Sequence, residues 1–230
     1  MPFSGVVDVI NNLTTTKKVI FLSNAPRTAE MTCIALQSYG INTRAEDIVT
    51  SSDIARIELK RNLSKKIYHI CDDKNQDLLR DIDVNVVTNI SNADLLLLSV
   101  FVHESEQEDK FDTILHEAVK QNLPLICTNP DTYVPNGYCA GVFAKKYKKM
   151  GGAVTYYGKP YPQIFEVAYD RCGTEKSKIL MIGDTFETDV VGAAKFGIDV
   201  ALTLTGNGVL AYKNLSEREL QPTYVIEGLW

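Results

Sequence analysis

The sequence predicts an α/β protein built on a parallel β-sheet with crossover helices. Short apolar runs alternate with stretches of helical period along the whole chain, and this alternation is typical of parallel sheets. With 230 residues, 45% of them apolar, the chain is long enough for one or two packed domains. In such a sheet, reactive residues gather in loops after the carboxyl ends of the strands.

The elements follow one another in a regular order. Residues 47–63 predict a short strand, a Ser52 cap and a helix. Further helices are predicted at residues 27–40, 108–122, 162–173 and 188–197. Further strands are predicted at residues 17–24, 65–71, 84–89, 93–101, 124–129, 153–158, 178–183 and 199–205.

Composition excludes several classes of function. The net charge of -5, with scattered Lys and Arg, gives no basic stripe for nucleic acid or an acidic membrane surface. The longest apolar run, 93–102, is about half the length that crosses a bilayer. No secretory or transit segment is visible in residues 1–16. Five dispersed cysteines without a C-x-x-C pair fit reduced thiols, so we expect a cytoplasmic protein.

The first loop with chemical content is FLSNAPR. Ser23 and Asn24 end an apolar strand before a helix, so a hydroxyl and backbone N–H groups could cradle a phosphate. A strand-to-helix turn, with either residue as the cap, is the competing interpretation.

The second loop is YYGKPYPQIF. Lys159 lies between a glycine and a proline just after a predicted strand. A fixed ammonium there suits the neutralisation of a carboxylate or phosphoryl oxygen. The alternative is an exposed lysine in a turn.

The third loop is GDTFETD. Asp184 leaves a strand tip and Asp189 falls in the first turn of the following helix, so both carboxylates could reach one cation. Hard oxygen ligands suit Mg²⁺. Thr188 or Asp189 could instead serve only as a helix cap.

Together the three loops resemble the haloacid dehalogenase superfamily, in which a Ser or Thr, a Lys and an acidic loop occur in this order. The phrases LSNAPRTA, TSSD, CTNPDTYVPNGYCAGVF and YYGKPYPQIFEVA look like its class IIA branch over nearly the whole chain. The resemblance implies a Rossmann-like core at residues 1–65 and 151–230 with an inserted α/β cap at 66–150. Asn129 and Asp131 of the cap could face the substrate, or could form an Asx-Pro turn.

The resemblance also implies a nucleophilic Asp in a D-x-D motif on the first central strand of the core, and this motif is not recognised here. Asp81 and Asp83 precede a cap strand, so they are not a credible replacement. We therefore expect a core that lacks its first strand, either because the true start lies upstream or because a separate segment supplies the strand. Without a shared neighbour, the strands ending at Ser23 and Asp184 would be poorly stabilised.

The expected function is magnesium-dependent hydrolysis of a small phosphorylated metabolite, impaired in this chain alone. The alternative is an inactive remnant that still binds a phosphate or a partner. A flavodoxin-like binding module is a weaker third interpretation. Cap-to-cap homodimers also occur in the branch that this chain resembles. His69, His103 and His116 show no metal-ligand spacing.

Overall fold

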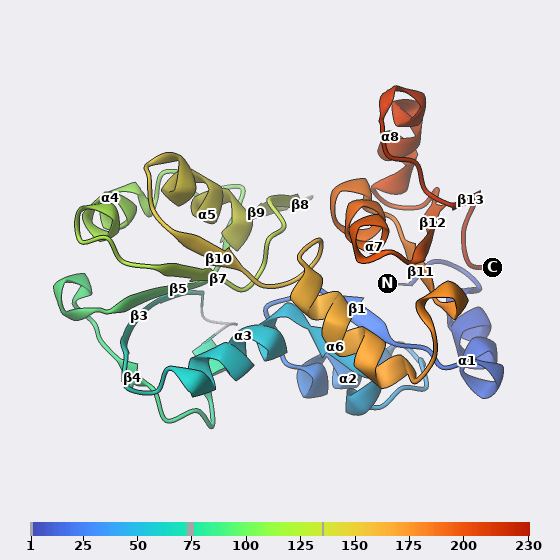
Figure 1. The fold of residues 1–230 in the computed structure, drawn as a ribbon, viewed down its shortest axis with the longest axis horizontal. Helices are drawn as coiled ribbons and strands as arrows, with labels where there is room; N and C mark the ends of the chain where they lie inside the picture. The colour runs from blue at the N-terminus through green and yellow to red at the C-terminus, as the bar shows by residue number, and fades with distance from the viewer. Residues whose placement is uncertain (1, 73–75, 135) are drawn as a thin grey trace. The chain divides into compact units, whose positions relative to one another are not determined.

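The structure, a computed structural model, describes residues 2–72, 76–134 and 136–230. Its elements, labelled in Figure 1, fall into two compact units. The first unit comprises Met1–Leu22, Ala29–Val49 and Lys159–Trp230, and the second unit comprises Ser23–Thr28 and Thr50–Gly158. The predicted insertion, residues 66–150, lies within the second unit, which extends beyond it on both sides.

The second unit is built around a five-stranded parallel sheet. In spatial order its strands are β10 (Val154–Tyr156), β7 (Leu125–Cys127), β5 (Leu95–Ser99), β3 (Lys66–Cys71) and β4 (Asn85–Val86). Every residue of β5 is buried, as expected for an apolar strand in a parallel sheet that is covered on both faces. This sheet provides the α/β architecture that the sequence predicts.

Besides short 3-10 turns, the described residues of the second unit also form three α-helices and a small antiparallel sheet. The helices are α3 (Ser51–Arg61), α4 (Asp112–Lys120) and α5 (Ala140–Lys149). The small sheet has the order β6 (Phe101–His103), β9 (Gly137–Cys139), β8 (Tyr133–Val134). The strand predicted at 93–101 is thus divided between two sheets, because the chain leaves β5 at Val100 and pairs β6 with β9.

Thr50, and not Ser52 as predicted, caps α3. The Thr50 side chain accepts a hydrogen bond from the Asp53 backbone N–H (3.1 Å), and its hydroxyl donates to Asp53 Oδ2 (2.7 Å). Ser52 lies inside the helix, where its hydroxyl donates to the Ala25 carbonyl. The helix therefore begins one residue before the predicted cap.

The first unit contains two separate sheets. The parallel sheet is β11 (Leu180–Gly183), β12 (Asp199–Thr203), β13 (Tyr224–Ile226), and the second sheet pairs β1 (Phe21–Ser23) with β2 (Ile48–Thr50). Among the described residues, β1 pairs only with β2 and β11 only with β12. A strand between β1 and β11 remains a prediction.

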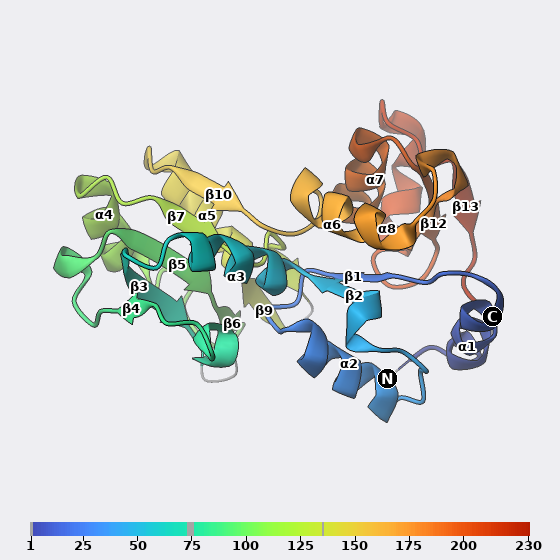
Figure 2. The ribbon, with the colours of Figure 1, turned by 60° about the horizontal axis from the view of Figure 1, so that its bottom comes forward.

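The described residues of the first unit also form five α-helices. They are α1 (Val6–Thr16), α2 (Ala29–Ser38), α6 (Pro162–Cys172), α7 (Val191–Phe196) and α8 (Gly208–Lys213). Of these, α7 and α8 contact β12. Figure 2 shows α2 beside β1 and β2, and Ala29, Cys33 and Ile48 form the buried cluster there. Within 2–72, 76–134 and 136–230, no helix has the length and apolar character needed to span a membrane.

Candidate functional site

The predicted acidic loop begins where β11 ends. Asp184 follows the strand directly, and Phe186–Val190 forms a π-helical turn, η5, that leads into α7. The helix predicted at 188–197 therefore starts as a π turn, a rare geometry that recurs at functional sites. Gly183 allows the Asp189 carboxylate to approach the backbone, since an added Cβ would lie only 2.3 Å from Asp189 Oδ2.

Lys159 and Asp189 form an ion pair, with 2.6 Å between Nζ and Oδ1. Both side chains are shielded from solvent, with exposures of 14% and 4% respectively. The other Asp189 oxygen accepts the Thr185 backbone N–H at 3.0 Å. The carboxylate therefore fixes the direction of the lysine ammonium and is itself fixed by the loop.

Asp184 lies next to this pair in the same loop, and its hydrogen bonds within the described part of the chain are to neutral groups. Its Oδ2 accepts the Asn207 backbone N–H (2.9 Å), and its Oδ1 accepts the Thr185 hydroxyl (3.2 Å). The Asn207 side chain also donates to the Thr185 hydroxyl, at 3.1 Å. These contacts orient the Asp184 carboxylate without neutralising its charge.

The residues present fit a magnesium ion with one protein carboxylate. Mg²⁺ is commonly held by one or two carboxylates together with substrate phosphate and water, and Asp184 is available for that role. The Asp189 carboxylate is paired with the Lys159 ammonium. That Asp189 also binds the metal ion stays a prediction. Within the described part of the chain, no three His, Cys, Asp or Glu side chains gather in a metal-binding group.

The other four predicted residues lie together in the second unit. Asn24 Nδ2 donates to Asp131 Oδ1 at 2.9 Å, and the Asp131 N–H donates to Asn129 Oδ1 at 2.9 Å. The second bond spans Pro130, so the Asx-Pro turn proposed as the alternative does form. Ser23 Oγ accepts the Ala25 N–H at 3.1 Å, as a turn residue does.

Gly158 packs closely against Asn24. Its φ is +118°, and an added Cβ would lie 2.6 Å from Asn24 Oδ1 and 2.9 Å from Ser51 Cβ. Only glycine combines this backbone conformation with so close an approach. The seven predicted site residues thus form two groups, with Lys159, Asp184 and Asp189 in the first unit and Ser23, Asn24, Asn129 and Asp131 in the second.

The cysteines and histidines near these groups show no catalytic environment. Burial raises the pKa of Cys127 and of Cys139 to about 12, so both thiols stay protonated at neutral pH. His69 shares a 2.7 Å hydrogen bond with Ser99 Oγ, and burial lowers its pKa to about 4. These surroundings are those of side chains that pack in the interior.

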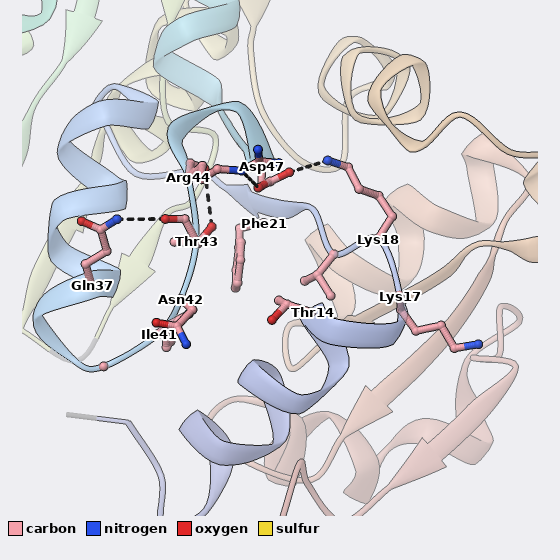
Figure 3. A pocket seen from close by; sticks show the side chains of 12 residues that line it. Thr14, Lys17, Lys18, Phe21, Gln37, Ile41, Asn42, Thr43, Arg44 and Asp47 are labelled. Atoms are coloured by element: carbon pink, nitrogen blue, oxygen red, sulfur yellow. Dashed lines mark hydrogen bonds and ion pairs between the residues drawn. The ribbon is translucent and has the colours of Figure 1, made fainter.

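A pocket of about 580 Å³ lies elsewhere in the first unit (Figure 3). Phe21 and the cationic Lys18 and Arg44 line it, and both cations pair with Asp47. Lys17 and Lys18 precede β1, so the pocket lies at the amino end of that strand, whereas Ser23 lies at the carboxyl end. None of the seven predicted site residues lines it.

Two family models match the sequence that forms these groups. A haloacid dehalogenase-like hydrolase model matches residues 1–85, and a HAD-hydrolase-like model matches residues 156–230. The chain belongs to the haloacid dehalogenase-like hydrolases. The resemblance drawn from the three loops is therefore confirmed, and the α/β fold of these hydrolases with it.

Relatives of the chain include named sugar phosphatases. The chain is 26% identical over 213 residues to an acid sugar phosphatase of Staphylococcus haemolyticus, which covers 90% of this chain and 79% of the relative. It is 27% identical over 221 residues to the sugar-phosphatase AraL of Bacillus subtilis, at 93% and 79% coverage. A hydrolase crystal structure from Brucella suis aligns with a TM-score of 0.82 and 28% identity, over 100% of this chain and 90% of that one.

Sequence reasoning missed the residues that orient the predicted carboxylates. Thr185 contacts both Asp184 and Asp189. Because it lies between these two candidate acids in the sequence, its contact with them could have been proposed from the sequence. Asn207 lies 23 residues away from Asp184 in sequence, and no local pattern points to their contact. Only the return of β12 beside β11 brings Asn207 to the loop.

Proposed function

We propose that this chain carries the magnesium-dependent phosphatase chemistry of its family and acts on a small sugar phosphate. The observation that supports this most strongly is the shielded ion pair of Lys159 and Asp189, joined through Thr185 to Asp184. A fixed ammonium beside an uncompensated carboxylate suits a phosphoryl group, which needs both charge neutralisation and a cation site. The names of the two relatives support a sugar phosphate as substrate.

Each residue of the first group has a distinct proposed role. Lys159 Nζ binds a phosphoryl oxygen and neutralises charge that develops there. Asp189 keeps the ammonium directed, and Asp184 would hold the magnesium ion. Magnesium bound there supplies further neutralisation of charge on the transferring group.

We propose that the second unit acts as the cap and contributes to the choice of substrate. Asn24 and Asp131 offer amide and carboxylate groups that are already oriented by one another. Such groups suit the hydroxyls of a sugar, because oriented donors and acceptors give a binding site its specificity. Asp131→Ala should therefore change the KM values for sugar phosphates, and by different factors for different sugars. The KM for p-nitrophenyl phosphate, which has no sugar, should change less.

None of the residues given a role above is proposed as the nucleophile. The one D-x-D of the sequence, Asp81–Asp83, belongs to the second unit, and both aspartates are exposed there. We therefore propose that the 230-residue chain alone hydrolyses phosphomonoesters poorly. We further propose that an extended apolar segment carrying D-x-D completes the site by pairing with the open edges of β1 and β11.

The absence of a D-x-D from the first unit also favours a second candidate function. The chain would bind a phosphate or phosphorylated ligand through Lys159 and Asp184 without turning it over. Binding without turnover, even with a D-x-D segment present, separates this function from that of a phosphatase.

The test is hydrolysis of p-nitrophenyl phosphate by the purified chain with Mg²⁺, with and without a synthetic peptide of an apolar strand ending in D-x-D. We expect little turnover alone and a clear increase with the peptide, abolished by Lys159→Ala or Asp184→Ala. Lys178→Ala is the matched control, because Lys178 is exposed and pairs only weakly with Glu175. Hydrolysis that survives Lys159→Ala and Asp184→Ala would overturn the proposal.

A further inference from the structure

We propose that Arg218 is a positioning residue for the phosphatase centre and acts through the turn η5, an inference that rests on the proposed function. Arg218 contacts this turn in two ways. Its guanidinium carbon lies 3.9 Å from the centre of the Phe186 ring, and its Nη1 donates to Glu187 Oε1 at 3.0 Å. Both contacted residues lie between Asp184 and Asp189.

The contacts of Arg218 are with a turn of unusual geometry. It is a π-helical segment of five residues, a rare geometry that occurs mostly as a single turn. Phe186 is only 4% exposed, so a cation over the face of its ring is partly removed from water. A cation–π contact is stronger under these conditions than at an exposed site.

Arg218 is itself held in place. Its backbone N–H donates to the Leu215 carbonyl at 3.1 Å, and its own carbonyl accepts Gln221 Nε2 at 2.7 Å. Leu215 is buried, which anchors the segment that carries Arg218. The Arg218 side chain is 31% exposed, compared with 67% for Glu187, and an exposed ion pair alone contributes little. The contact with Phe186 therefore carries most of the effect.

The consequence for the site follows from the contacts of the turn. Asp189 lies in the same turn, two residues after Glu187, and it holds Lys159 through Oδ1 and the Thr185 N–H through Oδ2. When the turn loosens, the direction of the lysine ammonium and the orientation of Asp184 loosen with it. Arg218 touches none of these groups, so it acts only through the turn.

The first test measures amide hydrogen exchange in the full chain without metal. Arg218→Ala should speed exchange of the Thr185 and Asn207 amides, which bond the two carboxylates, by about fivefold or more, the equivalent of one cation–π contact. Amides of β12 should keep their rates, and Arg218→Lys should restore much of the protection. Arg44→Ala is the control, since Arg44 also pairs with a glutamate in the first unit.

The second test measures hydrolysis of p-nitrophenyl phosphate under the conditions in which the wild type is active. For Arg218→Ala we expect kcat to fall about fivefold, with KM changed by less than about twofold. Unchanged loop exchange, equal acceleration of the β12 amides, or an unchanged kcat would overturn the positioning role. A wild-type chain that shows no hydrolysis even with the D-x-D peptide would instead contradict the proposed function, and the exchange rates alone would then decide the role of Arg218.

Discussion

Lys159 Nζ and Asp189 Oδ1 are 2.6 Å apart in a pair whose side chains are almost removed from solvent. Each charge in such a pair depends on the other, because removal of one partner leaves an uncompensated charge away from water. The pair joins the start of α6 to the turn before α7, and the stacked rings of Phe165 and Phe196, 5.7 Å apart, hold the same two helices together. The pair therefore ties a proposed catalytic cation to the packing of the first unit.

We predict that Asp189→Asn lowers the free energy of unfolding by about 3 kcal/mol, because Lys159 is then buried without its counter-charge. The double variant Lys159→Met with Asp189→Asn should recover part of this loss, because no charge remains buried. Urea unfolding followed by circular dichroism measures both. Equal stability of Asp189→Asn and the wild type would show that the pair contributes little.

Replacement of the α3 cap should distinguish Thr50 from Ser52. We predict that Thr50→Ala costs about 1 kcal/mol, because the Asp53 N–H loses its acceptor. Thr50→Ser keeps the hydroxyl and should restore most of the stability. Thermal unfolding of both variants beside Ser52→Ala gives the comparison, and a larger loss for Ser52→Ala would contradict the cap assignment.

The second unit should lose stability in mild acid through His69. Burial lowers the pKa of the folded imidazole to about 4, below the ordinary value of 6.5, so the unfolded chain binds more protons between these values. Stability should therefore be full above about pH 6.5 and fall by about 3 kcal/mol as the pH approaches 4. The free energy of unfolding measured from pH 7 to pH 4.5 tests this dependence.

His69→Gln should flatten that pH dependence, because the titrating group is gone. The matched control is His116→Gln, since His116 lies exposed on α4, where it bonds the Asp112 carbonyl. A pH dependence that is the same in His69→Gln and the wild type would assign the acid sensitivity to other groups.

Gly158→Ala should disturb the group around Asn24. We predict a loss of about 2 kcal/mol, because the positive φ is strained for alanine and the new Cβ meets Asn24 Oδ1. Gly173→Ala is the control: its φ is also positive, at +65°, but no atom lies within 4 Å of the added Cβ. Equal losses in the two variants, measured by thermal unfolding, would mean that the contact with Asn24 contributes nothing.

The parallel sheet of the second unit could be predicted because its strands are continuous apolar runs. Leu95–Ser99 is such a run, and burial on both faces leaves no alternation to misread. The division of residues 93–101 between two sheets could not be predicted, since it depends on the pairing of β6 with the distant β9. Local pattern determines that a strand forms, whereas tertiary pairing determines where it ends.

The candidate site was predictable in its residue types and less so in its contacts. The GDTFETD motif indicated both carboxylates, but no local sequence pattern indicated that Asp189 pairs with Lys159, 30 residues away. The cap of α3 was misplaced because Thr50, Ser51 and Ser52 are all plausible caps, and the preceding strand decides between them. Arg218 had no local signal, since its role depends on the return of the chain to η5.

The most direct test of the central claim is calorimetric titration of the purified chain with inorganic phosphate in the presence of Mg²⁺, which needs no nucleophile. If Lys159 and Asp184 act on one phosphoryl group, Lys159→Ala and Asp184→Ala should each weaken phosphate binding by about tenfold or more, the loss of a charge-assisted contact. Lys178→Ala should bind phosphate as the wild type does. Equal phosphate affinity in the wild type, Lys159→Ala and Asp184→Ala would contradict the account.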